Sequence, residues 1–226
     1  MSSQAQSKGD VLQRIGGVGL VLGGILIIVG NVIFPRADDP ASAAATFKAY
    51  GENPDMTRIA VLLVLLGEWA VLGGIAAVYR SITTGAGSAW SRLGFYGYVI
   101  ATAIFNITLV FVLAATTASE KGPTAVGIGL TMVTAANSLL AVSVLTYWLS
   151  FALLGISISV STVFPKWVGW VAVLLGVATV AVIGVPYIFM DQTKTLQTVF
   201  MILALLSAIW TLGVGALIVR REMKAM

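Results

Sequence analysis

The sequence predicts an all-α protein, a polytopic transmembrane bundle of six helices with cytoplasmic N- and C-termini and a short extracytoplasmic helix in the first loop. Of its 226 residues, 58% are hydrophobic and 10% are charged, which lies far outside the balance of soluble domains. The apolar residues form six long runs, and about 20 residues at 1.5 Å each cross a hydrocarbon core of about 30 Å. The 24 glycines suit helices that pack closely in lipid.

We expect a single membrane domain that comprises residues 1–226. Its six spans are expected at about residues 11–34, 56–80, 93–118, 130–161, 166–190 and 196–219. The first span is rich in glycine, and Gly19 and Gly23 form a GxxxG pair. Because such a pair lets two helix backbones approach closely, we expect this face to pack against a neighbouring helix.

The loop after the first span is predicted to contain a short helix over about residues 40–50, lying along the outer interface. Asp39 is a suitable N-cap, Pro40 suits the first helical position, and Gly51 can end the helix in the left-handed conformation. The pair Asn53-Pro54 repeats the cap and proline signal at the start of the second span. This loop helix is either a cover over the bundle or a docking surface for a partner.

The fourth apolar run is too long for one perpendicular crossing of the membrane. It follows a tight turn at residues 119–123 and continues to Phe164. A helix of this length must tilt, protrude or break. Polar residues change face along the run, which indicates that its two halves contact different neighbours.

The fifth span is predicted to bend near its outer end. Pro186 lies late in this span and removes one intrahelical hydrogen bond. A proline within a helix is a common cause of a kink.

The basic residues predict the orientation of the bundle. The side that carries both termini holds eight of the 13 cations, whereas the opposite side holds five cations together with six of the nine acids. By the positive-inside rule the terminal side is cytoplasmic. The net charge of +4 therefore reflects the excess of cations on the cytoplasmic side, where they contact membrane lipids. We expect no nucleic-acid partner. The cations of the terminal side are Lys8, Arg14, Arg80, Arg92, Lys166, Arg220, Arg221 and Lys224.

The second span carries one acid, Glu68, close to the predicted midplane of the membrane. An ionised group at this depth costs about 3 kcal/mol, so Glu68 must be protonated, or face other helices or a wet cavity. It is either a structural tie between helices or an ion or proton site, and we favour a sealed tie. The candidate intramembrane polar site comprises Glu68, Trp69, Asn106, Asn137 and Tyr147.

We expect no enzymatic activity, no cofactor and no metal site. The sequence contains neither cysteine nor histidine, and it lacks nucleotide-binding, hydrolase and metalloprotease motifs. The glycine-rich helices could instead contact other membrane proteins. We therefore expect an accessory or structural subunit, or a scaffold, with a protein partner or a second copy of itself in the membrane. The alternative is a small-solute or proton-coupled transporter that uses Glu68.

The length, the six spans and two helix starts resemble a widespread group of bacterial six-helix integral membrane proteins that is catalogued as a domain of unknown function. The two starts are Arg14-Ile15-Gly16-Gly17 in the first span and Pro165-Lys166-Trp167-Val168-Gly169-Trp170 in the fifth. The resemblance covers most of the chain and transfers no site residue and no activity. We expect a multi-pass protein of the inner or plasma membrane of a prokaryote.

Overall fold

The computed structural model describes residues 3–189 and 193–224, and this part of the chain contains helices and no strand. Six helical segments are long and apolar enough to cross a membrane. The predicted all-α six-helix bundle is confirmed, and the chain is an integral membrane protein. The helices that contain these segments are α1 (Ser3–Ile33), α3 (Pro54–Ser81), α4 (Gly87–Glu120), α5 (Val126–Val160), α6 (Lys166–Thr179) with its continuation α7 (Val185–Phe189), and α8 (Lys194–Lys224).

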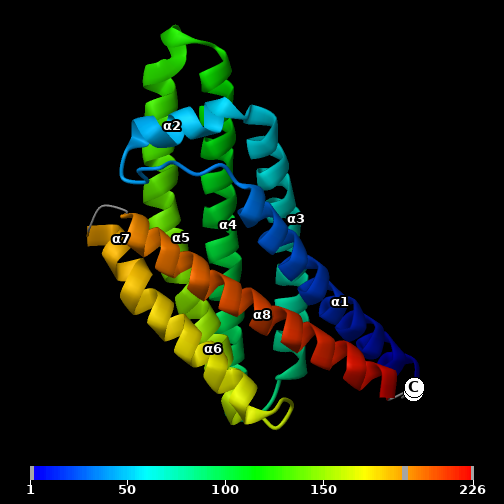
Figure 1. The fold of residues 1–226 in the computed structure, drawn as a ribbon. Coiled ribbons are helices and arrows are strands. Elements are labelled where there is room, and N and C mark those ends of the chain that lie inside the picture. Colours follow the sequence, from blue (N-terminus) through cyan, green and yellow to red (C-terminus); the bar gives the residue numbers. More distant parts are fainter. Residues whose placement is uncertain (1–2, 190–192, 225–226) are drawn as a thin grey trace.

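The helix α2 (Ala43–Glu52) crosses α4 and α5 at the end of the bundle opposite the chain termini (Figure 1). We call this end the α2 end and the opposite one the terminal end. The helix α1 packs along both α3 and α8, while α5 packs against α4 and α6. The positive-inside rule predicts that the α2 end is extracytoplasmic.

The helices α4 and α5 extend beyond α2 as a hairpin (Figure 1). They contain 34 and 35 residues. At 1.5 Å per residue each is about 50 Å long, which exceeds a hydrocarbon core of about 30 Å. Within the long fourth run, residues Val126–Val160 form one unbroken helix. The predicted turn before it is present, with Gly122 at φ +76° and Pro123 opening a short 3₁₀ turn, Pro123–Ala125.

Glycines let α1 approach its two neighbours closely, as the GxxxG pair predicts. A Cβ on Gly19 would lie 2.7 Å from a backbone carbonyl oxygen of α3, and one on Gly23 would lie 2.6 Å from the carbonyl oxygen of Gly67. On another face of α1, a Cβ on Gly17 would lie 3.1 Å from the carbonyl oxygen of Gly215 in α8. These glycine faces are therefore occupied within the bundle.

The loop helix is present, but two of its predicted boundaries are wrong. Ser42, and not Asp39, is the N-cap, because its Oγ accepts the Ala45 N–H at 3.2 Å. Asp39 instead forms the turn before the helix, where its carbonyl accepts the Ser42 N–H. Gly51 is helical rather than left-handed, and a Cβ there would lie 2.8 Å from the Ser119 Cβ. The space at Gly51 is needed for contact between α2 and α4.

The cap of α3 agrees with the sequence prediction. The Oδ1 of Asn53 accepts the Met56 N–H at 3.2 Å, and Pro54 occupies the start of the helix. The side chains of α2 cover the bundle, since Phe47 packs on Gly129 and Tyr50 is buried against Phe34. Burial raises the pKa of Tyr50 to about 12, so this phenol is neutral at physiological pH.

The fifth span is interrupted where the sequence predicts a distortion. A π-helical turn, Val180–Gly184, separates α6 from α7, and Pro186 is the second residue of α7. A proline ring clashes with the carbonyl four residues earlier, and a widened turn relieves this clash.

The third span begins earlier than expected, at Gly87 instead of residue 93. The turn before it closes at Gly85, where φ is +73°, and the Gly85 carbonyl accepts the Ser88 N–H.

The orientation can be tested with single cysteines at Ser42, near the α2 end, and Ser88, near the terminal end. The sequence contains no cysteine, so no background substitution is needed. We expect a membrane-impermeant maleimide to label Ser42→Cys in intact cells and Ser88→Cys after the membrane is opened. The reverse labelling pattern would reject the predicted orientation.

Candidate functional site

The spacing of apolar residues in α3 directs Glu68 into the bundle. Val64, Val71 and Ile75 are buried, and they lie three, four or seven residues from Glu68, which places all four on one helix face. Glu68 itself is 6% exposed. The next residue, Trp69, is 60% exposed and lies on the outer surface of the helix.

A chain of hydrogen bonds joins Glu68 to two tyrosines from neighbouring helices. The Tyr147 hydroxyl of α5 donates to the Glu68 Oε2 at 3.1 Å, and it also pairs with the Tyr98 hydroxyl of α4. Each phenol has one donor hydrogen. Because Tyr147 donates to the carboxylate, Tyr98 must donate to Tyr147. This order orients both phenols toward a negative charge on Glu68.

The carboxylate has no basic partner among residues 11–189 and 193–221, the ranges whose side chains the structure describes. No lysine or arginine nitrogen in these ranges lies within 4.0 Å of Glu68. The phenol of Tyr147 is therefore its polar partner within the described part of the chain. A buried carboxylate that lacks a cation is costly unless a ligand or a proton neutralises it.

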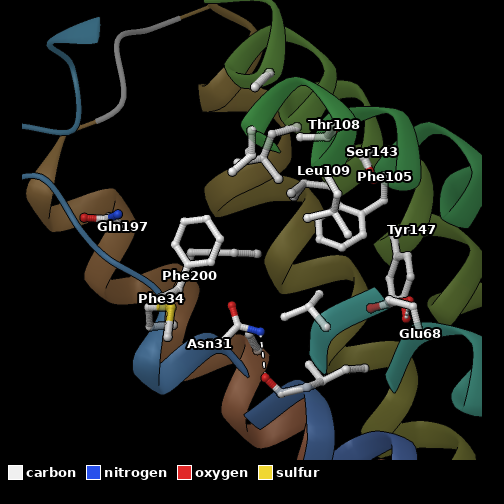
Figure 2. Close-up of a pocket in the computed structure, with 18 of the residues that line it drawn as sticks. Asn31, Phe34, Glu68, Phe105, Thr108, Leu109, Ser143, Tyr147, Gln197 and Phe200 are labelled. Carbon is white, nitrogen blue, oxygen red and sulfur yellow. Dashed lines mark hydrogen bonds between the residues drawn. The ribbon is translucent and has the colours of Figure 1, made fainter. Parts of the chain in front are cut away.

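Glu68 lines a cavity of about 280 Å³ that extends to the α2 end. The residues at the Glu68 end include Ile75 and Tyr98, while those at the α2 end include Arg36 and Gln197. Figure 2 shows Glu68 and Tyr147 on one side of this space and Phe34 and Gln197 on the other.

The wall of the cavity is largely aromatic and aliphatic, with a few polar groups. The hydroxyls of Thr108 and Ser143 donate to carbonyls of α4, and the Asn31 amide donates to the Ile27 carbonyl at 2.9 Å. These groups keep acceptor lone pairs for a solute. The aromatic residues of the wall are Phe34, Tyr50, Tyr98, Phe105, Tyr147, Trp148, Phe151, Tyr187 and Phe200.

Arg36 lies at the α2 end of the cavity, where α1 gives way to the loop. Its Nη2 donates to the Asn31 carbonyl at 2.8 Å and lies 3.6 Å from the Met201 Sδ in α8. This guanidinium thus links the end of α1 to α8. It is an exposed side chain, so the cavity reaches the surface region of the α2 end.

The five residues of the predicted polar site are only partly brought together. Tyr147 bonds Glu68, and Asn137 lines the same cavity without a side-chain hydrogen bond to another described residue. Trp69 faces away from it. Asn106 lies outside the cavity wall, and its Oδ1 is buried without a hydrogen-bond partner in the described chain.

Sequence reasoning missed Tyr98 and the α2-end residues Arg36 and Gln197. Tyr98 lies one turn before Thr102 inside an apolar run, and this polar spacing could have indicated an inward face. The positions of Arg36 and Gln197 depend on how α1 and α8 meet, so no local pattern indicates them. Across the part of the chain that the structure describes, no cluster of acidic, histidine or cysteine side chains could hold a metal ion.

Comparisons with protein-family models, with curated proteins and with solved structures found no match for this chain. The resemblance to bacterial six-helix membrane proteins therefore stays a prediction. The fold and the cavity identify the chain as a multi-pass integral membrane protein with a buried carboxylate, Glu68, at an internal cavity.

Proposed function

We propose that this protein is a small-solute carrier in which Glu68 is the ionisable group of the binding cavity. The observation behind the proposal is the position of Glu68 on the wall of a cavity that extends to the α2 end. Ionisable residues within membrane spans commonly mark ion or substrate pathways. We assign no chemical reaction to the site, and we favour a transporter over an accessory subunit.

Two further features support a carrier over a structural tie or a scaffold. A sealed tie would leave no space beside its carboxylate, whereas Glu68 adjoins about 280 Å³ of cavity. A scaffold was expected from the glycine faces of the first span, and Gly17, Gly19 and Gly23 contact α8 or α3 inside the bundle. These faces are therefore not free for a partner protein.

The distorted fifth span is also consistent with a carrier. Tyr187 lines the cavity and lies directly after the π-helical turn Val180–Gly184 and Pro186. Irregular helices that line a cavity are a recurring feature of secondary transporters, because they free backbone groups and permit local movement. This segment is where we expect the wall to move during transport.

The proposal can be tested by single-cysteine accessibility at Asn137, which lines the cavity from α5. A carrier exposes its site to each side of the membrane in turn. We therefore expect a small charged methanethiosulfonate reagent to label Asn137→Cys from either side, in right-side-out and inside-out vesicles. The adjacent Ser138 is exposed on the outer surface of α5, so Ser138→Cys is a matched control. A thiol facing lipid should resist the charged reagent from both sides.

Labelling of Asn137→Cys from the α2 end alone would contradict a carrier, since it describes a cavity with one permanent opening. Protection of this cysteine from both sides would contradict any solute-binding role for the cavity.

A further inference from the structure

We propose that the solute of this cavity is an organic monocation, with its positive charge beside Glu68 and its apolar body against the aromatic wall. This inference rests on the proposed carrier function and adds the chemical class of the solute. It follows from the charge of the cavity, from the chemistry of its wall and from its size.

The charge of the inner cavity favours a cation. Glu68 lines this end, and no lysine or arginine nitrogen of residues 11–189 and 193–221 approaches it within 4.0 Å. The basic side chain of the cavity wall, Arg36, lies at the α2 end and is held by the Asn31 carbonyl. An anionic solute at the inner end would meet a carboxylate in a medium of low dielectric, where like charges repel strongly.

The wall beside Glu68 is suited to an organic cation. Tyr147 bonds the carboxylate, its ring centroid lies 4.4 Å from that of Tyr98, and Trp148 and Phe151 continue the same wall. Aromatic faces carry partial negative charge and attract a desolvated cation. The aliphatic part of the wall, including Val71, can contact the apolar body of the solute.

An inorganic divalent cation fits this site poorly. Calcium takes six to eight oxygen ligands, and magnesium requires a near-ideal octahedron. At the inner end, the described chain places one carboxylate and two phenols, and it offers no metal-binding cluster of acidic side chains. An organic cation needs no such shell, because charge and ring contacts replace directed ligands. A cavity of about 280 Å³ suits a small molecule of this kind.

Isothermal titration of the full chain in mild detergent can test this inference, with benzyltrimethylammonium as the cationic probe. Benzenesulfonate, which is similar in shape and opposite in charge, is the comparison ligand. We expect the cation to bind and the anion not to bind. Glu68→Gln should weaken cation binding by about tenfold or more, as expected for losing an interaction of about 1.4 kcal/mol. Phe151→Leu should weaken it about two- to fivefold, because it removes a ring face from the wall beside Glu68.

The control variant is Trp69→Leu, because Trp69 neighbours Glu68 in sequence and faces outward. It should bind the cation like the unmodified protein. If Glu68→Gln does not fold, Glu68→Asp retains the carboxylate and should retain measurable binding. Equal binding of both probes, or cation binding that Glu68→Gln leaves unchanged, would overturn the inference.

The cysteine experiment separates this inference from the proposed carrier function. Labelling of Asn137→Cys from both sides, without cation binding, would overturn the inference and leave the carrier in place. Cation binding with labelling from the α2 end alone would overturn the carrier and leave a static cation site.

Discussion

Replacement of Glu68 by leucine is expected to stabilise the purified protein by about 2 kcal/mol, because a buried carboxylate costs about 3 kcal/mol at this depth and its hydrogen bond returns about 1 kcal/mol. The same variant should lose cation binding entirely. The substitution removes the acceptor of the Tyr147 hydroxyl hydrogen, because Tyr98 donates to Tyr147 and cannot accept from it in the same contact. Tyr147 lines the cavity, where a water molecule can accept this hydrogen. Thermal unfolding in detergent measures the first effect, and isothermal titration measures the second.

The sign of the stability change separates a binding site from a structural tie. If Glu68 ties helices together, its removal should destabilise the bundle by about 1 to 3 kcal/mol. Glu68→Gln serves as the control, since glutamine preserves the shape and the hydrogen-bonding capacity of the side chain. A leucine variant less stable than the glutamine variant would contradict a functional role for the carboxylate. Residues retained at a cost in stability are typical of functional sites.

The second large effect is expected at Gly169, where α6 meets α5. A Cβ at this position would lie 2.5 Å from the Gly155 carbonyl oxygen and would also collide with the Ser159 amide. Both obstacles are backbone atoms, which no side-chain rotation can move. We therefore expect Gly169→Ala to destabilise the protein by about 3 kcal/mol or more, at the upper end of overpacking effects. Thermal unfolding and the yield of monodisperse protein would show the loss.

A glycine with free space around it provides the control for this substitution. Gly213 in α8 has no atom within 4 Å of its ideal Cβ position. Gly213→Ala should be neutral or stabilise the helix by up to about 1 kcal/mol, since alanine is the better helix former. Equal stability of the Gly169→Ala variant and the unmodified protein would show that the backbones of α5 and α6 do not approach this closely.

Local chemistry explains which parts of the fold the sequence predicts. Asn53 caps α3 as expected because the cap and its target N–H lie three residues apart. The predicted cap of α2 is wrong because Asp39 and Ser42 are both suitable caps. A turn in which the Asp39 carbonyl accepts the Ser42 N–H precedes the helix, so Ser42 caps it. The left-handed conformation predicted for Gly51 is wrong because this glycine packs against Ser119 of α4, a contact that no local pattern encodes.

In the candidate site too, features set by local sequence were predictable, and features set by contacts between helices were not. The depth of Glu68 follows from its position in an apolar run, so the carboxylate was predictable from sequence. The cavity beside it was not, because it is a space left between several helices and depends on where their side chains end. Tyr147 was among the expected partners of Glu68, whereas Tyr98 reaches the carboxylate through another residue.

The contribution of α8 to the cavity has a consequence for biosynthesis. Phe200, Met201 and Ala204 of this helix form part of the wall, yet α8 is translated after the other five spans. Until it inserts, the cavity that holds Glu68 lacks one wall, and α1 lacks the partner of its second glycine face. The nascent bundle therefore has an incomplete cavity wall until α8 inserts. Closure of the site is one of the last events in assembly of the fold.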